Sequence, residues 1–226
     1  TALIVYTSNN LYLKVLGSTG CLHFLSLKTM GGIAGMIRFD GRAVSFNDIT
    51  AIQQQLKHRG VVTSQVNEQG IVWNFGGLIE ADNTADLFAT ADADIFNSSV
   101  SQSFIANYLR IGTSSFNELN ADFAVAVWDT RRQLLICARD ILGVKPLYYV
   151  HQPGQFFAFA SEIKALIALE EVIISPNRNK FREYLTWTTA YVPYSSETFY
   201  ENIYSLLPGH YLEVKAQEVR LLPYWK

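Results

Sequence analysis

The chain has 226 residues, 49 % of them hydrophobic and 17 % charged, and its formal net charge is −2. This composition is typical of a globular protein with a sizeable core, and it excludes a disordered chain. Basic residues form no cluster or stripe in the sequence, so nucleic acid is not an expected partner. No run of about 18 or more apolar residues occurs, so we expect no membrane-spanning helix.

The cysteine and histidine content argues against a disulfide-stapled or metal-binding protein. Cys21 and Cys137 are too few for a disulfide framework or a zinc site. His151 and His210 lie in expected turns without a second ligand at metal spacing, so no metal is expected in this chain. These features favour a reducing, cytoplasmic location.

Residues 1–29 are interpreted as a loosely attached N-terminal extension. Residues 11–16 and 22–27 are expected to form short strands. The alternatives are residues ahead of a natural start at Met30, or a structural role such as an added edge hairpin. Because the chain starts on Thr1, we expect it to be trimmed or to be a piece of something longer. Cys21 has no obvious base nearby and is not expected to act as a nucleophile.

A buried strand is predicted over residues 31–39, where three glycines imply close approach of the backbone. A helix is expected next, with Asn47 or Asp48 as its N-cap and Gly60 at its end. Its inward face is expected to contain Ile49, Ile52 and Leu56. A further strand is predicted over residues 71–75.

Another buried strand is predicted over residues 87–91, leading into Asp92-Ala93-Asp94. A second helix follows, with Ser99 or Ser101 as the expected N-cap and Gly112 as the expected stop. Its inward face is expected to contain Phe104, Ile105, Tyr108 and Leu109.

Four apolar runs, at residues 122–129, 134–138, 145–150 and 156–160, are predicted to be strands. Short turns between them favour an antiparallel meander whose first two strands form a hairpin. Ser161 is expected to cap a helix that follows, with Ile163, Leu166 and Ile167 facing inward. Strands that are apolar on both faces, with helices before and after them, predict an α+β fold. We expect a four-layer αββα sandwich of two antiparallel sheets.

Residues 172–226 are more irregular. A helix is expected over residues 179–187, and two short strands are expected on either side of Gln217-Glu218. The chain ends on large apolar residues without a polar tail. We therefore interpret residues 172–226 as a connector toward a further domain.

Several motifs stand in a recognisable order and spacing. They are Met30-Gly31-Gly32-Ile33-Ala34-Gly35, His58-Arg59-Gly60, Asp122 to Asp129, Ala138 to Tyr149, Ala160 to Leu166, Leu207 to Leu212, and the terminal Tyr224-Trp225. With these motifs, residues 30–226 resemble the N-terminal half of the asparagine synthetase family. The resemblance implies a class II glutamine amidotransferase domain of the Ntn-hydrolase fold over residues 30–171. The likeness is nearest to lasso-peptide cyclases and β-lactam synthetases.

The resemblance also implies a glutamine site that has lost its reactive groups. In active members the thiol of an N-terminal cysteine attacks the amide, its own α-amino group is the base, and an oxyanion hole stabilises the developing charge. Here Gly31 occupies the nucleophile position and follows 30 other residues. Gly77 replaces the arginine that binds the substrate carboxylate, and Val100 replaces the carboxylate that holds the substrate amine. The family's Asn-Gly-Glu is Asp92-Ala93-Asp94, so an amide donor is lost.

The other matching residues are interpreted as structural. Asp129 and Gly143 suit turns, Pro146 suits the start of a strand, and Arg139 is expected to pair with a neighbouring carboxylate. The dipeptide His58-Arg59 is expected to end a helix, where cations suit the helix dipole.

These features lead to one hypothesis and two alternatives. The hypothesis is a degenerate amidotransferase-type domain without glutaminase activity, acting as scaffold for a synthetase domain in cis or in trans. The family implies that such a partner forms an amide bond with ATP and magnesium on a peptide or small amino-acid-like substrate; no cofactor is expected in this chain. The alternatives are an active fragment of a glutamine-hydrolysing asparagine synthetase and a stand-alone, non-catalytic binding module.

Overall fold

The computed structural model describes residues 3–7, 10–16, 22–27, 31–66, 70–75, 78–82, 86–96, 103–186 and 195–225. The helices are α1 (Phe46–Leu56), α2 (Phe104–Ile111), α3 (Ile163–Ile167) and α4 (Arg178–Thr186), with 3-10 helices η1 (Lys57–Arg59) and η2 (Gly112–Asn117). The strands are β1 (Leu3–Thr7), β2 (Asn10–Leu16), β3 (Leu22–Leu27), β4 (Gly32–Arg38), β5 (Val62–Val66), β6 (Gly70–Phe75), β7 (Leu78–Asp82), β8 (Leu87–Ile95), β9 (Ala121–Asp129), β10 (Leu134–Arg139), β11 (Tyr148–Gln152), β12 (Phe156–Ala160), β13 (Ile203–Ser205), β14 (His210–Val214) and β15 (Val219–Pro223). None of the helices in the described ranges is long and apolar enough to cross a membrane.

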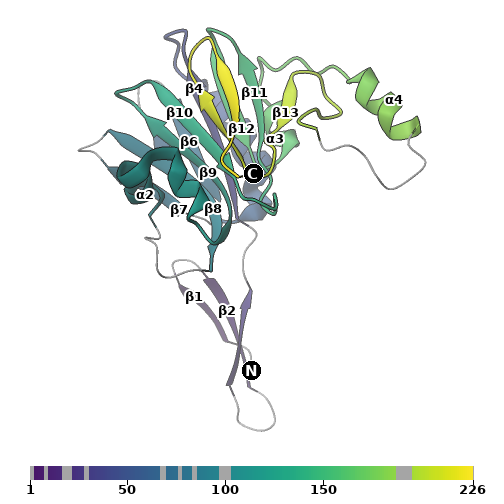
Figure 1. Ribbon diagram of the computed structural model, residues 1–226. Coiled ribbons are helices and arrows are strands. Elements are labelled where there is room, and N and C mark those ends of the chain that lie inside the picture. Colours follow the sequence, from purple (N-terminus) through teal and green to yellow (C-terminus); the bar gives the residue numbers. More distant parts are fainter. Residues whose placement is uncertain are drawn as a thin grey trace.

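Two six-stranded antiparallel sheets form the body of the protein (Figure 1). The first, named here the β9 sheet, has the strand order β15-β14-β10-β9-β8-β7. The second, named the β4 sheet, has the order β13-β11-β12-β4-β6-β5. Strands β1, β2 and β3 pair only with one another in a three-stranded antiparallel sheet, so the two strands predicted before residue 30 are confirmed.

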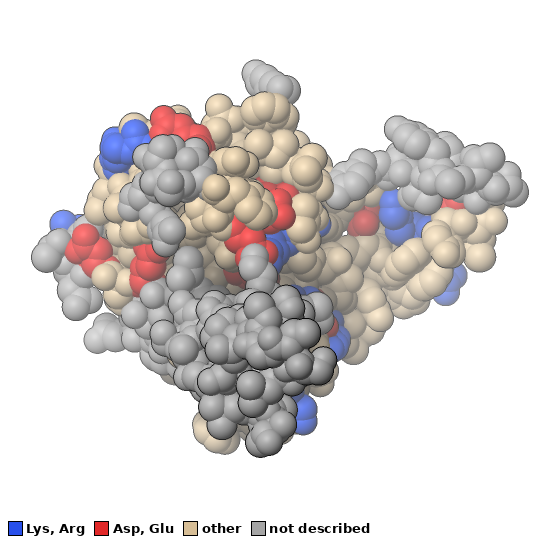
Figure 2. Space-filling model, turned by 90° about the horizontal axis from the view of Figure 1, so that it is seen from below, with Lys and Arg blue, Asp and Glu red and all other residues tan. Residues whose placement is uncertain are grey.

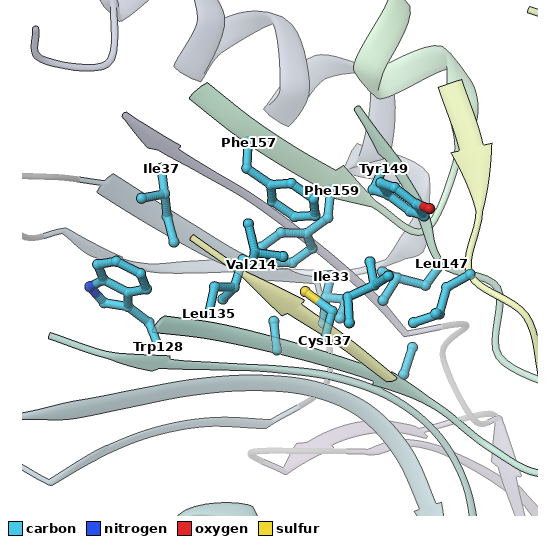
Figure 3. Packing of buried hydrophobic residues seen from close by; sticks show 14 residues of the cluster. Ile33, Ile37, Trp128, Leu135, Cys137, Leu147, Tyr149, Phe157, Phe159 and Val214 are labelled. Carbon is cyan, nitrogen blue, oxygen red and sulfur yellow. The ribbon is translucent and has the colours of Figure 1, made fainter. Parts of the chain in front are cut away.

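Three apolar layers show how sheets and helices stack. Side chains such as Ile33, Phe157 and Phe159 fill the space between the two sheets (Figure 3). Helices α1 and α3 pack on the outer side of the β4 sheet, and α2 packs on the outer side of the β9 sheet. The order helix, sheet, sheet, helix confirms the predicted αββα arrangement.

Strand alternation assigns each residue of β4 to one of these layers. Successive side chains of a strand point to opposite faces. Ile33 and Ile37 therefore lie between the sheets, while Ala34 and Met36 lie in the layer with α1 and α3. Both faces are buried, which explains why the strand is a continuous apolar run in the sequence.

The predicted meander is wrong at one step, because the chain changes sheet after β10. Strands β9 and β10 form the expected hairpin, but β11 and β12 pair within the β4 sheet. Arg139 holds the crossover by donating to the carbonyl oxygens of Lys145 at 2.8 Å, Leu206 at 2.8 Å and Gly143 at 2.6 Å. These carbonyls stand where a carboxylate partner was expected. Gly143 is the predicted turn residue and has φ +70°.

The first two helices begin at serines that the pattern did not single out. The hydroxyl of Ser45 caps α1 by accepting the N–H of Asp48 at 3.0 Å, so the predicted caps Asn47 and Asp48 are wrong. Ser103 caps α2, and Ser99 and Ser101 lie outside the described residues. Leu109 is 54 % exposed, so the buried face of α2 is narrower than expected.

Ser161 also has a different role from the predicted one. Its hydroxyl accepts the backbone N–H of Ile33 at 2.9 Å, which ties the end of β12 to the start of β4. The N-cap position of α3 belongs to Glu162. A side-chain bond across strands therefore outcompetes the local cap that the sequence pattern suggested.

Residues 172–226 combine a helix that extends away from the sandwich with strands that belong to it. Helix α4 confirms the helix expected there and extends outward in Figure 1. Strand β13 forms one edge of the β4 sheet, and β14 and β15 complete the β9 sheet. The segment interpreted as a connector thus supplies three strands to the two sheets.

Candidate functional site

Gly31 lies immediately before β4 and is buried. Its carbonyl oxygen accepts a hydrogen bond from Arg59 Nη1 at 2.7 Å. A β-carbon added to Gly31 would lie 2.5 Å from Oδ1 and 2.9 Å from Cγ of Asp92. Real β-carbons do not approach other atoms so closely, so the Asp92 carboxylate fills the place where a side chain at residue 31 would begin.

Strand alternation explains why Gly31 and Asp92 meet. Gly31 is two residues before Ile33, which faces the layer between the sheets, so a side chain at residue 31 would point toward the β9 sheet. In β8, Ala93 packs with the layer under α2. Asp92 and Asp94 therefore face the opposite way, toward the β4 sheet.

Lys145 joins the two aspartates. Its Nζ lies 2.9 Å from Asp92 Oδ1 and 3.2 Å from Asp94 Oδ2. Burial alone would lower the pKa of Lys145, but the hydrogen bonds and charges of Asp92 and Asp94 outweigh it and raise this pKa above its usual value. The ammonium group therefore stays charged, and it holds the Asp92 carboxylate against Gly31.

A second charged group lies on the helix side of Gly31. The Glu162 carboxylate contacts His58 Nε2 at 2.7 Å and Lys164 Nζ at 2.9 Å, and it also accepts a hydrogen bond from Arg59 Nε. Burial would raise the pKa of Glu162, but the hydrogen bonds from Lys164, Arg59 and His58 lower it to about 2. Arg59 thus links Glu162 to the carbonyl of Gly31.

The structure brings together part of the glutamine site that the resemblance implies. Asp92 meets Gly31 at one end of β4 and Lys145 links Asp94 to Asp92, whereas Ala93 faces the α2 layer. Gly77 and Val100 lie outside the described residues. Sequence reasoning missed Arg59 and Lys145, which were assigned to a helix end and a strand. Both residues lie within the motifs that carry the family resemblance. That position was the only feature of the sequence that could have indicated a role at the site.

Residue 31 offers no side-chain group that could attack an amide. Nucleophilic catalysis needs a side chain that attacks and a base that activates it, and glycine supplies no attacking group. An oxyanion is stabilised by N–H donors, whereas an ionised carboxylate such as Asp92 only accepts hydrogen bonds. Cys137 is no substitute, since it lies between the sheets, where burial raises its thiol pKa (Figure 3).

Other parts of the described molecule are separate from this cluster. A cavity of about 530 Å³ is lined by Tyr108, Leu134 and Ile136, which belong to the layer under α2, on the face of the β9 sheet away from Asp92. Within the described residues, no group of three or more His, Cys, Asp or Glu side chains could hold a metal ion. Figure 2 shows basic and acidic side chains in small groups of both signs over the described part of one face.

Several curated relatives carry asparagine synthetase names, among them the following two. Putative asparagine synthetase (glutamine-hydrolyzing) 2 of Methanocaldococcus jannaschii is 25 % identical over 248 residues, covering 87 % of this chain and 47 % of the relative. Asparagine synthetase (glutamine-hydrolyzing) 3 of Bacillus subtilis is 33 % identical over 119 residues, covering 53 % of this chain and 19 % of the relative. The chain thus spans less than half of the length of either relative.

A solved structure and a protein family complete the comparison. Glutamine phosphoribosylpyrophosphate amidotransferase of B. subtilis superimposes with a TM-score of 0.56 and 14 % identity, covering 86 % of this chain and 49 % of that one. At this identity the likeness shows the fold, which is that of the Ntn-type amidotransferases. The family described as glutamine amidotransferase domain matches residues 68–225, which is more than half of the chain. The chain therefore belongs to the glutamine amidotransferase domain family, among the amidotransferase domains of asparagine synthetase-like proteins.

Proposed function

We propose that this chain is a degenerate amidotransferase domain that does not hydrolyse glutamine and that serves as scaffold for an ATP-dependent, amide-bond-forming domain. One observation carries the first part of this proposal. The Asp92 carboxylate fills the space in which a side chain at residue 31 would begin, with Oδ1 2.5 Å from the place of its β-carbon; by the resemblance, residue 31 is the position of the family's nucleophile.

Three requirements of glutamine hydrolysis fail together at this position. Gly31 has no attacking group. In the chain that retains residues 1–30, its nitrogen is joined to Met30 in a peptide bond, so it is an amide and not a basic amine. Asp92 stands where the family has an amide donor, and an acceptor cannot stabilise an oxyanion. Losing a base or an oxyanion donor alone typically costs on the order of 10²–10⁴-fold in rate.

Glutamate release from L-glutamine by the purified 226-residue chain tests this part. We expect no glutamate above the buffer control, measured beside an active class II amidotransferase. We also expect no release by a chain begun at residue 31 that carries Gly31→Cys, because Asp92 still occupies the site. Glutamate release by the unsubstituted chain would overturn the proposal and establish the alternative of an active fragment.

The scaffold role is supported by an exposed aromatic cluster in residues 172–226. The Phe181 ring lies 4.8 Å from that of Phe199, and Tyr184 meets Phe199 edge-on at 5.5 Å. All three rings are exposed. Apolar groups that gather on a surface mark contact sites for other domains or proteins, whereas a stand-alone module would cover this segment with polar groups. This favours the scaffold over the stand-alone alternative.

The proposal places ATP, magnesium and the amide-forming reaction in a synthetase domain, joined to this chain or encoded separately. The resemblance to lasso-peptide cyclases and β-lactam synthetases suggests a peptide or a small amino-acid-like substrate for that partner, in the cytoplasm. The coding DNA around Lys226 tests this. We expect a continuing frame, or a neighbouring gene, that encodes a Ser-Gly-Gly-x-Asp-Ser-type loop. Absence of that loop from both would refute the scaffold role.

A further inference from the structure

We propose that Asp92, held by Lys145, is an internal occupant of the side-chain position at residue 31, so that a side chain there and the Asp92–Lys145 pair exclude one another. The inference rests on the proposed function and deepens it, because the glutamine site is then closed from within. Restoring a side chain at residue 31 alone does not reopen it. Residues 31 and 92 must change together.

The first support is that Asp92 has little freedom to move aside. It lies within β8, where it pairs with Ala124 of β9, and is only 4 % exposed. Oδ1, the atom that a β-carbon at residue 31 would meet, is also the atom that contacts Lys145 Nζ at 2.9 Å. Moving that oxygen therefore breaks the ion pair, and leaving a buried charge without its partner is costly.

The second support is that Lys145 is fixed from its backbone outward. Its N–H donates to Asp140 Oδ2 at 2.9 Å, and its carbonyl oxygen accepts Arg139 Nε at 2.8 Å. Its ammonium group also contacts Asp94 Oδ2 at 3.2 Å. Because its cationic partner is anchored, the Asp92 carboxylate is held in place. It therefore cannot move away from a β-carbon at residue 31 as easily as a solvent-exposed carboxylate would.

The neighbouring Gly32 provides a matched control. A β-carbon at Gly32 would point to the helix side of the β4 sheet and lie 2.5 Å from Cδ of Arg59. The crowding is as tight as at Gly31, but it involves no atom of Asp92. Neither glycine has a positive φ. Alanine at either position is therefore opposed by steric overlap with a neighbouring side chain and not by backbone strain.

A double-mutant cycle on the full chain tests the coupling. Urea unfolding is measured for the unsubstituted chain, Gly31→Ala, Asp92→Ala and the double variant, with Gly32→Ala made in both backgrounds. We expect Gly31→Ala to raise the unfolding equilibrium constant by about tenfold or more when Asp92 is present, and by about twofold or less when it is alanine. Gly32→Ala should have the same effect in both backgrounds.

Equal effects of Gly31→Ala in the two backgrounds overturn the proposal. If Gly31→Ala does not fold, the double variant with Asp92→Ala must fold, and failure of both also overturns it. The cycle needs no enzymatic activity, so it is independent of the proposed function. Glutamate release by the unsubstituted chain would refute the proposed function, but the unfolding cycle could still be interpreted. If the chain releases no glutamate and the stability effects of Gly31→Ala and Asp92→Ala are additive, only the coupling is refuted.

Discussion

Replacing Asp140 with alanine should destabilise the protein because this carboxylate organises the crossover between the two sheets. Asp140 is 1 % exposed and lies directly after β10. Its Oδ1 accepts the N–H of Val144 and its Oδ2 that of Lys145, both at 2.9 Å. Those two bonds fix the loop that carries Lys145 to Asp92.

The magnitude follows from these two bonds. A hydrogen bond to a charged group contributes about 1.5–3 kcal/mol to stability. The backbone bonds of Asp140 to Phe123, Gly143 and Gly209 do not involve the side chain and are kept. Removing a buried charge also relieves its desolvation, so the lower value applies to each lost bond. We expect Asp140→Ala to lower the free energy of unfolding by about 3 kcal/mol.

Urea unfolding followed by tryptophan fluorescence measures this loss as a shift of the midpoint at constant slope. Glu118→Ala is the control, because it removes a carboxylate whose ion pair with Arg110 is exposed on both sides. Such pairs contribute about 0–1 kcal/mol. If Asp140→Ala costs no more than Glu118→Ala, the argument that this carboxylate organises the crossover is refuted.

Two further predictions concern the charged group beside Gly31 and the core. The folded-state pKa of Glu162 is lowered from 4.5 to about 2, so its ionised form adds stability that is fully present above pH 4.5 and lost as the pH falls toward 2. Glu162→Gln should therefore reduce the loss of unfolding free energy between pH 4.5 and 2. An unchanged pH dependence in this range would contradict the prediction. Phe159→Ala should lower the free energy of unfolding by about 3–5 kcal/mol, because Phe159 is fully buried between the sheets. Leu185→Ala, at a residue that is 77 % exposed, should change it by about 0.5 kcal/mol or less; similar losses for the two variants would contradict the assignment of the core.

The elements themselves were largely predictable, because hydrophobic periodicity is local. Runs such as residues 122–129 and 156–160 are apolar on both faces, and in the structure each is buried on both faces. Two of the errors arose where a nonlocal partner competed with a local rule. Ser161 bonds across to Ile33 instead of capping α3, and Arg139 binds three carbonyl oxygens that the chain brings back to it.

The sheet change after β10 illustrates the limit of local patterns. Residues 134–139 and 148–152 are equally good strands, and a short connection suggested that they pair. The sequence of a strand does not determine which sheet it joins. That choice depends on which edge strand of either sheet is still free to pair. β10 pairs with β14 and β11 with β13, so each edge is taken by a strand from residues 203–214.

For the candidate site, the sequence by itself determined what residue 31 lacks. A glycine has no side chain in any fold, and the resemblance of the motifs on both sides predicts that it stands at the nucleophile position. Only the tertiary structure decided what stands in its place. Asp92 and Lys145 are distant from Gly31 along the chain. Asp92 meets Gly31 because side chains alternate along β4 and β8, so that both positions face the layer between the two sheets. The crossover loop then brings an ammonium group to the carboxylate, so position and charge at this site come from packing between the sheets.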